Sequence, residues 1–258
     1  MEGWHGWDAY AAFYDWENAR TVGRRDVRFW QKLIQTHPGP VLELGCGTGR
    51  VSIGVSRVAE SLVGVDRSQA MLRLAIRRRR RSRRVGSLRF VRGDIRTLPF
   101  PSAFSFKVVM APYGVLQSLV RDRDLRQALH SARRVLRPDG LFVIDLVPEL
   151  PTWREYASHV TLRGRRGRST RIRLVESVTQ HPARGVTEFD QEFIEERAGQ
   201  RRSTRFTLTF RTLSMRQMSG RLRRAGFRIE RLEGDYRGGD WHPDAATWII
   251  VATPNGSS

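Results

Sequence analysis

Short apolar segments alternate with amphipathic segments along the first 147 residues, and this alternation predicts parallel strands joined by helices. The strands that we expect are residues 41–44, 61–65, 88–91, 106–110 and 141–147. Residues 125–136 have the periodicity of an amphipathic helix, and residues 137–140 supply stop and turn signals. Nearly continuous apolar strands are typical of a parallel sheet covered on both faces. The pattern therefore predicts an α/β fold.

The pattern changes after residue 147, where β-prone residues alternate only partly with polar ones. We expect three antiparallel strands, separated by the turn-like sequences QHPARG and RAGQ, at residues 170–179, 186–195 and 203–214. A helix over 215–225 and strands over 227–232 and 246–252 follow. The last two strands are expected to complete a seven-stranded sheet. The three antiparallel strands form an insertion into this core, before the last helix.

The sequence VLELGCGTGR at residues 41–50 places three glycines at alternate positions after a buried strand. Such glycines allow a tight turn that presents bare backbone to a ligand. A dinucleotide-binding G-x-G-x-x-G pattern would need glycine at position 50, where Arg50 stands. The spacing E-x-G-x-G-x-G resembles the cofactor loop of class I S-adenosylmethionine-dependent methyltransferases.

Two further segments carry this resemblance. VGVDRSQAML at 63–72 is similar to the second motif of the family, in which an acid at a strand end binds the ribose diol, and Asp66 holds that position. After the third strand, Asp94 matches the acid that contacts the adenine amine, and the backbone amide of Ile95 matches the group that reads the ring. The cofactor-binding residues that the resemblance implies are Tyr14, Glu43, Gly45, Cys46, Gly47, Gly49, Asp66, Arg67, Met71, Asp94, Ile95 and Ala111.

RRVLRPDGLFVIDLV at 133–147 is also similar to the family, so that the resemblance is strong over residues 8–147. It implies a Rossmann-like seven-stranded sheet with a small antiparallel insertion. The single domain, 1–258, would comprise an N-terminal helical lid, a cofactor-binding core, a β insertion, and the last helix with the closing strands, at residues 1–36, 41–147, 150–213 and 214–252. The cofactor would be S-adenosyl-L-methionine.

The acceptor is expected to meet the segment after the fourth strand, Ala111-Pro112-Tyr113-Gly114. Methyltransferases of base amines usually carry N-P-P-Y there, and the missing polar first residue makes that reaction less favoured. Insertions of this kind are common in methyltransferases of small molecules, where they roof the substrate pocket or form a dimer contact. We therefore expect methyl transfer to a small-molecule N or O, with a possible homodimer through the insertion. Two alternatives stay open: an RNA or protein methyltransferase using the arginine-rich surface, and a polyanion-binding protein without cofactor affinity.

Aromatic residues are concentrated near the N-terminus, where YAAFYD at 10–15 is similar to a helix that many small-molecule members fold over the cofactor. Tyr14 would then approach the sulfonium or the carboxylate, although Trp4, Trp7 and their neighbours could equally pack this helix on the core. The candidates for the substrate pocket are Tyr14, Tyr113, His181 and His242. A surface or loop position is favoured for each histidine, and no His, Cys or Asp spacing indicates a metal site.

The formal net charge of +20 comes almost wholly from arginine. Residues 77–84 contain seven arginines, but they lead into the start of the third strand, on the far side of the sheet from the expected cofactor site. Nucleic acid is a possible partner there, and a solvated basic surface is favoured. Arginines at the expected roof could hold a phosphate or carboxylate, with a solvated hairpin again favoured: Arg163, Arg165, Arg166, Arg168 and Arg171.

Cys46 is the only cysteine, which excludes an internal disulfide, and its place within the glycine loop indicates a small residue beside the cofactor. No apolar run approaches the length of about 18 residues that a membrane span needs. The first ten residues do not combine a basic segment with an apolar stretch. We therefore expect a cytoplasmic enzyme without a membrane partner.

Overall fold

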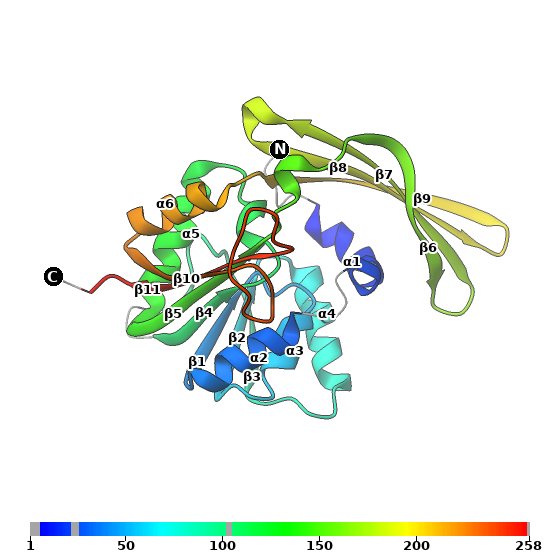
Figure 1. Ribbon diagram of the computed structural model, residues 1–258. Helices are drawn as coiled ribbons and strands as arrows, with labels where there is room; N and C mark the ends of the chain where they lie inside the picture. The colour runs from blue at the N-terminus through cyan, green and yellow to red at the C-terminus, as the bar shows by residue number, and fades with distance from the viewer. Residues whose placement is uncertain (1–5, 22–25, 102–104, 257–258) are drawn as a thin grey trace.

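The computed structural model describes residues 6–21, 26–101 and 105–256, which form a seven-stranded sheet flanked by helices and a separate four-stranded antiparallel sheet (Figure 1). The larger sheet has the order β10-β11-β5-β4-β1-β2-β3. Its strands are β1 (Pro40–Leu44), β2 (Ser61–Asp66), β3 (Leu88–Arg92), β4 (Phe106–Ala111), β5 (Leu136–Leu146), β10 (Phe227–Glu233) and β11 (Trp248–Pro254). Strands β1 to β5 pair in parallel, and β11 lies antiparallel between β5 and β10. This confirms the predicted α/β architecture.

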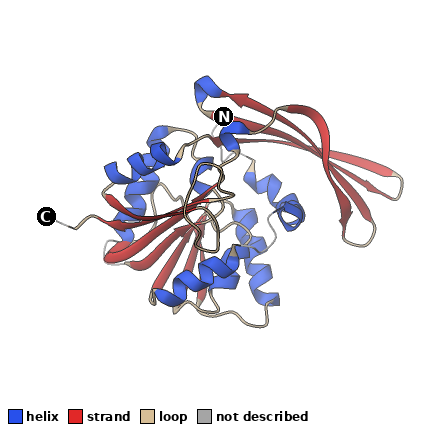
Figure 2. Cartoon of the chain, viewed as in Figure 1, coloured by secondary structure: helices blue, strands red, loops and turns tan. Residues whose placement is uncertain are grey.

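Helices cover both faces of this sheet, as Figure 2 shows by colour. One face packs on α2 (Val27–Thr36) and α3 (Arg50–Val55), and the other packs on α5 (Asp122–Val135) and α6 (Met215–Arg224). The remaining helices are α1 (Trp7–Thr21), α4 (Gln69–Arg81) and the short 3-10 turns η1 (Val115–Ser118), η2 (Leu150–Thr152) and η3 (Pro182–Arg184). The carboxyl ends of the parallel strands are consequently left to loops, which is where ligands bind in such sheets.

Local signals explain where the helices begin. Ser68 precedes α4, and its hydroxyl accepts a hydrogen bond from the backbone N–H of Met71 at 3.1 Å. Ser214 and Gln217 form a reciprocal capping box at the start of α6. Ser214 was expected to lie in a strand, but β9 ends at Arg211 and the capping geometry assigns Ser214 to the helix.

Residues 137–140 differ from the turn that their proline and glycine predicted. Together with Leu136, which was expected to end the helix, they are the first part of β5, which begins directly after α5. Leu136 pairs with Phe106 of β4, and the register then shifts before Leu141 pairs with Val108. The turn residues are therefore accommodated as an irregularity near the start of the strand, without a separate loop.

The smaller sheet, which we call the insertion sheet, contains four strands in sequential order: β6 (Tyr156–Arg166), β7 (Thr170–His181), β8 (Val186–Arg197) and β9 (Gln200–Arg211). The last three confirm the predicted antiparallel strands, but β6 was not predicted. β6 is an edge strand without a buried residue, and its exposed residues include Ser158, His159 and Arg163. Such residues lack the apolar alternation by which a half-buried strand is identified.

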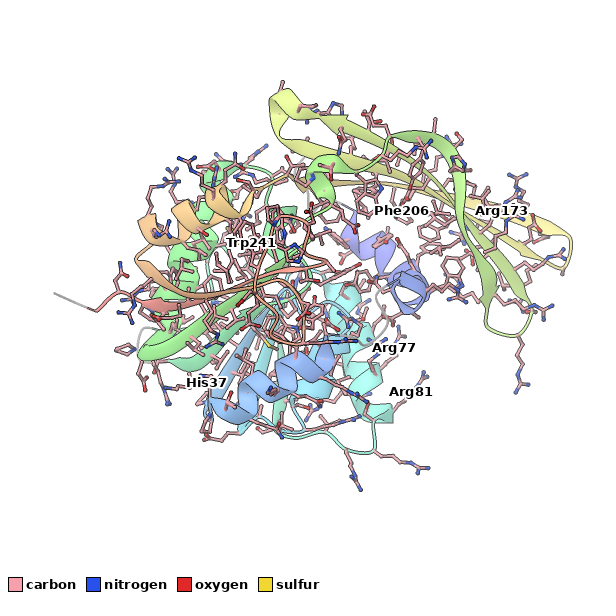
Figure 3. The ribbon with its side chains drawn as sticks, viewed as in Figure 1. His37, Arg77, Arg81, Arg173, Phe206 and Trp241 are labelled. Atoms are coloured by element: carbon pink, nitrogen blue, oxygen red, sulfur yellow. The ribbon has the colours of Figure 1, made fainter. Side chains whose placement is uncertain are left out.

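Helix α1 packs against one face of the insertion sheet through aromatic side chains. The rings of Phe13 and Phe193 stack with their centroids 4.4 Å apart, and Tyr10 meets Phe206 edge-on at 5.3 Å. Figure 3 labels Phe206 on the side of the sheet that faces α1. The expected helical segment 1–36 thus contains α1 and α2, while residues 1–5, including Trp4, and 22–25 lie outside the described residues.

Candidate functional site

The glycine loop connects β1 to α3 and turns in the left-handed region at each of its glycines. The φ angles are +64° at Gly45, +52° at Gly47 and +73° at Gly49, values that non-glycine residues rarely adopt. A Cβ on Gly45 would come within 2.2 Å of Val115, and a Cβ on Gly49 within 2.9 Å of Phe90. At Gly47 the nearest atom would be Cε1 of Tyr14, 4.0 Å away. The loop is therefore packed tightly at both ends and open in the middle.

Asp66, at the end of β2, fixes the middle of this loop. Its Oδ2 accepts the backbone N–H of Gly47 at 2.7 Å, and its Oδ1 accepts the N–H of Ser68 at 2.8 Å. Burial raises the pKa of Asp66, while these backbone donors act in the opposite direction. A carboxylate has about four acceptor positions, so both oxygens keep the capacity for a further donor. This arrangement suits a ribose diol.

Asp94 lies beyond the end of β3, half-buried, and is held by arginine. Nη2 of Arg96 approaches its Oδ2 at 2.7 Å, and Nη1 of Arg96 approaches Oδ1 of the buried Asp124 at 3.0 Å. Burial alone would raise the pKa of Asp94, but the hydrogen bonds and the charge of Arg96 hold it below its usual value. Asp94 is therefore an ionised acceptor in a fixed position, and the backbone N–H of Ile95 follows it.

These groups border one cavity of about 440 Å³, within the usual size of a small-molecule site. The glycine loop, both acids, α1, the segment after β4 and β9 all contribute to its wall. The lining includes Trp7, Asp8, Tyr14, Glu43, Gly45, Cys46, Gly47, Thr48, Arg50, Asp66, Arg67, Ser68, Met71, Asp94, Ile95, Pro112, Tyr113, Val115, Ser118, Leu119 and Phe210. Ten of the twelve predicted cofactor residues are thus brought together at the carboxyl ends of the parallel strands.

Comparison with known proteins indicates which family the glycine loop and its neighbours belong to. Residues 41–140 match the family model of a methyltransferase domain. A demethylmenaquinone methyltransferase of Thermotoga maritima is 31% identical over 149 residues, covering 55% of this chain and 60% of that protein. Residues 41–140 are a class I methyltransferase domain. The chain spans about half the length of the curated relatives that it matches.

Solved structures show the same fold over the rest of the chain. The CcbJ methyltransferase of Streptomyces caelestis has a TM-score of 0.79 at 20% identity, covering 96% of this chain and 97% of that one. CalS10 of Micromonospora echinaspora, an amino pentose methyltransferase solved with S-adenosylmethionine bound, has a TM-score of 0.70 at 20% identity, with 95% and 97% covered. The methyltransferase fold therefore extends through the insertion sheet.

The cavity of the methyltransferase domain fits S-adenosylmethionine, the cofactor of this family. Gly47 exposes backbone where a side chain would intrude, Asp66 offers acceptors to a diol, and Asp94 offers a fixed acceptor to an amine. Tyr14, on α1, presents a partly buried aromatic ring, and aromatic rings attract a cation. Burial also raises the pKa of its hydroxyl, so Tyr14 stays protonated at neutral pH.

Arg50 is a site residue whose role the sequence did not indicate. Its guanidinium binds the fully buried Asp26 through two hydrogen bonds of 2.5 and 2.7 Å, and it lies 5.8 Å from the ring centroid of Tyr113. Arg50 also lines the cavity beside the glycine loop. A cation held in this way beside Tyr14 suits the carboxylate of the cofactor.

The segment after β4 forms the acceptor side of the cavity. Tyr113 has φ of 59°, an uncommon conformation for a bulky residue, and the residue remains 37% exposed. The next N–H, of Gly114, donates to Oδ1 of the buried Asp145 at 3.0 Å, and Tyr236 donates to Oδ2 at 2.7 Å. Burial raises the pKa of Asp145 to about 6. Asp145 therefore braces the turn that presents Tyr113.

Helix α1 is attached to the glycine loop by polar contacts. Thr48 donates its hydroxyl to Asp15 at 2.6 Å, and Arg78 reaches from α4 to bind both the carbonyl of Thr48, at 2.9 Å, and the carboxylate of Asp15, at 2.8 Å. Arg78 belongs to the arginine run that was expected to face solvent far from the cofactor. That expectation is wrong for Arg78, whereas the neighbouring Arg77 and Arg81 are exposed and labelled on α4 in Figure 3.

Some predicted site residues lie elsewhere. Gly49 packs on Phe90, and Ala111 is fully buried in the core, so neither lines the cavity. His181 ends β7 and His242 lies in the connection from β10 to β11, both outside the lining. Phe210, from β9, was not predicted because it reaches the cavity from a strand far away in sequence.

None of the helices in the described part of the chain is long and apolar enough to span a membrane. Among the same residues, we find no group of three or more His, Cys, Asp or Glu side chains that could hold a metal ion.

Proposed function

We propose that this protein transfers the methyl group of S-adenosylmethionine to a nitrogen or oxygen of a small molecule. The observation that supports this most directly is the single cavity that joins the glycine loop and Asp66 to the aromatic residues Tyr14, Tyr113 and Phe210. The acceptor would enter beside the last two residues, between the segment after β4 and the insertion sheet. The relation to an amino pentose methyltransferase in fold supports an acceptor of similar size.

In this proposal, the glycine loop, Asp66, Asp94 and Arg50 hold the cofactor, which supplies an electrophilic methyl group. Methyl transfer is an in-line displacement, so the protein accelerates it mainly by positioning the acceptor and excluding water. α1 and the insertion sheet would enclose the cavity for this purpose. Tyr14 and Tyr113 would orient the acceptor through their rings and hydroxyls.

We further propose that the acceptor atom is an amine nitrogen. No histidine is among the described residues that line the cavity, and the raised pKa of Tyr14 prevents its hydroxyl from acting as a base at neutral pH. Of the lining acids, Glu43, Asp66 and Asp94 belong to the elements assigned to the cofactor, and Asp8 already accepts hydrogen bonds from Ser68 and Ala70. An amine needs no base if it arrives unprotonated, whereas a hydroxyl needs its proton removed.

The experiment is transfer of a labelled methyl group from S-adenosylmethionine to a panel of amino-sugars, other small amines and matched alcohols, in parallel with RNA and protein substrates. We expect labelled small amines, at rates that rise with pH through the pKa of the acceptor and persist at high salt. Labelled RNA or protein, lost steeply as salt rises, would support the alternative of a macromolecular substrate. Methylation of alcohols alone would contradict the amine assignment.

A further inference from the structure

The insertion sheet has two faces of different character. Ile172, Leu174 and Phe193 point towards α1 and are buried. Arg166 lies on the same side, with its guanidinium 4.8 Å from the ring of Phe13 in α1. Because successive residues of a strand point to opposite faces, the neighbouring Arg165 points away from α1. The odd-numbered arginines of β6 and β7 therefore occupy the outer face.

The register assembles these arginines into rows. Arg165 pairs with Arg171, Arg171 with Glu196, and Glu196 with Arg201, so that four strands contribute one row. In the next row, Arg163 pairs with Arg173, Arg173 with Ile194, and Ile194 with Ser203. We call these two rows the arginine face, and its arginines are Arg163, Arg165, Arg171, Arg173 and Arg201.

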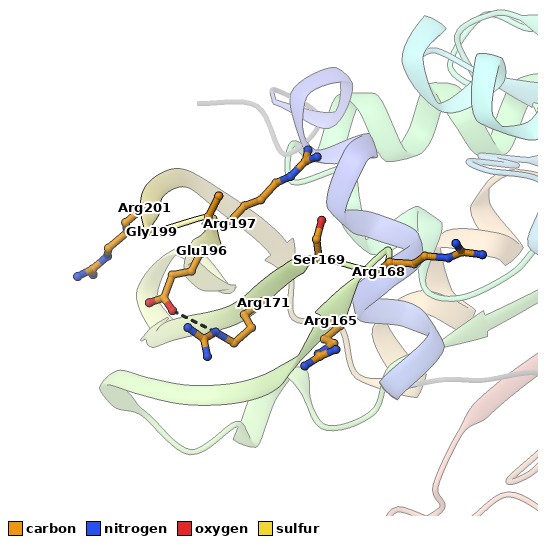
Figure 4. Close-up of a pocket in the computed structure, with 9 residues that line it drawn as sticks. Arg165, Arg168, Ser169, Arg171, Glu196, Arg197, Gly199 and Arg201 are labelled. Carbon is orange, nitrogen blue, oxygen red and sulfur yellow. Dashed lines mark ion pairs between the residues drawn. The ribbon is translucent and has the colours of Figure 1, made fainter.

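The residues of the first row line a concavity of about 430 Å³ at the tip of the insertion sheet, shown in Figure 4. Both hairpin turns contribute to its wall, and the lining residues are Arg165, Arg168, Ser169, Arg171, Glu196, Arg197, Ala198, Gly199 and Arg201. Five arginines oppose one glutamate, and that glutamate lies 3.6 Å from the guanidinium of Arg171. The lining therefore keeps a strong positive charge.

The second row contains an unsatisfied donor. Nε of Arg173 is buried and has no hydrogen-bond partner in the structure as described. A buried donor without an acceptor is costly, and guanidinium groups match phosphate oxygens in geometry and charge. The label of Arg173 in Figure 3 lies towards the outer part of the insertion sheet. Arg173 is itself only partly buried, so an anion on the arginine face could bind the outer nitrogens of this guanidinium and offset its charge.

The size of the face indicates more than one phosphate. Four strands spaced about 4.8 Å apart span roughly 14 Å, and successive rows lie about 7 Å apart. The described outer face offers no large aromatic ring in either row, so it lacks a platform on which bases would stack. Recognition would therefore depend on the anions themselves.

We propose that the arginine face binds a chain of phosphates, supplied either by inorganic polyphosphate or by the backbone of a nucleic-acid strand. This site is separate from the methyltransferase cavity. Phe210 of β9 lines that cavity, and Arg201 lies nine residues away on the same strand, at a distance of about 30 Å. A ligand on the arginine face would not occupy the cofactor cavity.

The test measures binding of tripolyphosphate and of a short single-stranded RNA to the full chain at several salt concentrations. The variant replaces three arginines of the first row: Arg165→Gln, Arg171→Gln and Arg201→Gln. The matched control makes the same charge change on α4, with Arg77→Gln, Arg80→Gln and Arg81→Gln, three exposed positions. We expect at least a tenfold loss of affinity in the row variant only, with the salt slope for RNA reduced by about 2.

A second variant distinguishes an effect of charge from an effect of misfolding, because we expect it to bind both probes more tightly, which a misfolded protein would not do. Glu196→Gln removes the only acid from the first row, so we expect tighter binding of both probes. Binding of tripolyphosphate alone or of RNA as well would support the site and identify its source of phosphate. Equal losses in the row variant and the α4 control, binding of neither probe, or competition between tripolyphosphate and S-adenosylmethionine would each overturn the proposal.

Discussion

Gly47 is the residue at which the glycine loop meets the cavity. Its φ of +52° strains any side chain, and a Cβ would project towards Tyr14. We expect Gly47→Val to weaken binding of S-adenosylmethionine more than tenfold, or about 1.4 kcal/mol and above, in calorimetric titrations. Gly185→Val is the control, since Gly185 has a φ of +61° in a turn outside the cavity lining. Similar losses in both variants would attribute the effect to general backbone strain.

Asp66 has two roles that one substitution removes together. It anchors the N–H groups of Gly47 and Ser68, and it is the proposed acceptor for the ribose diol. We expect Asp66→Ala to weaken cofactor binding by well over tenfold while the chain remains folded, as circular dichroism would show. Asp139→Ala, at an exposed acid paired with Lys107, should bind like the wild type. Wild-type affinity in Asp66→Ala would contradict the assignment of the site.

Glu43 gives a prediction about pH. Burial raises its pKa to about 8, although the hydrogen bond from Ser52 and the charge of Arg50 act in the opposite direction. A raised pKa in the folded state means that its stabilising contribution is complete below the unfolded value of 4.5 and is lost as pH rises towards 8. The free energy of unfolding of the unliganded wild type should therefore fall, relative to Glu43→Gln, between pH 5 and pH 8.

The size of that fall should be a few kcal/mol, because one pKa unit corresponds to about 1.4 kcal/mol. Urea unfolding of both proteins at four or five pH values would measure it. Curves that stay parallel across this range would show that Glu43 is not held in its protonated form by burial.

At the scale of elements, α1 connects the insertion sheet to the glycine loop. Its aromatic face packs on Phe193 and Phe206, whereas Asp15 joins it to Thr48 and Arg78. Arg78→Ala removes the contact that holds both Asp15 and the loop, so we expect cofactor affinity to fall. Arg77→Ala is the matched control, because this exposed neighbour lies in the same helix. Titrations that find equal affinity in the two variants would exclude a role for the Arg78 contact.

The elements also show which features a sequence can reveal. The strands of the core were predictable because Val41, Leu42 and Leu44 are all buried, as a sheet covered on both faces requires. Strand β6 was not, because an edge strand tolerates Ser158, His159 and its arginines without apolar alternation. A local sequence pattern reveals a strand through its buried positions, and β6 is little buried.

The same distinction applies to the site. Asp66 and Asp94 could be identified because each lies at or just beyond the end of a strand and matches a family motif. Asp145, Phe210 and the pairing of Arg50 with Asp26 could not, because their roles depend on contacts between segments far apart in sequence. The structure adds Phe210 and Arg50 to the wall of the cavity, with Asp145 and Asp26 supporting wall residues by hydrogen bonds, and removes Gly49 and Ala111 from it.

At the scale of the whole molecule, two arginine-rich regions, the end of α4 and the tip of the insertion sheet, have different surroundings. On α4, Arg78 is engaged by Thr48 and Asp15 while exposed neighbours cover the helix end. At the tip of the insertion sheet, the register places Arg165, Arg171 and Arg201 in one row. Net charge alone does not distinguish these regions, which is why variants with matched charge are needed.

The central claim is that the cavity at the strand ends binds S-adenosylmethionine. Calorimetric titration of the purified, nuclease-treated protein with S-adenosylmethionine and, separately, with NADH tests it most directly. We predict micromolar binding of S-adenosylmethionine at one site per chain, and none of NADH. Binding of NADH in its place, or of neither ligand, would contradict the account.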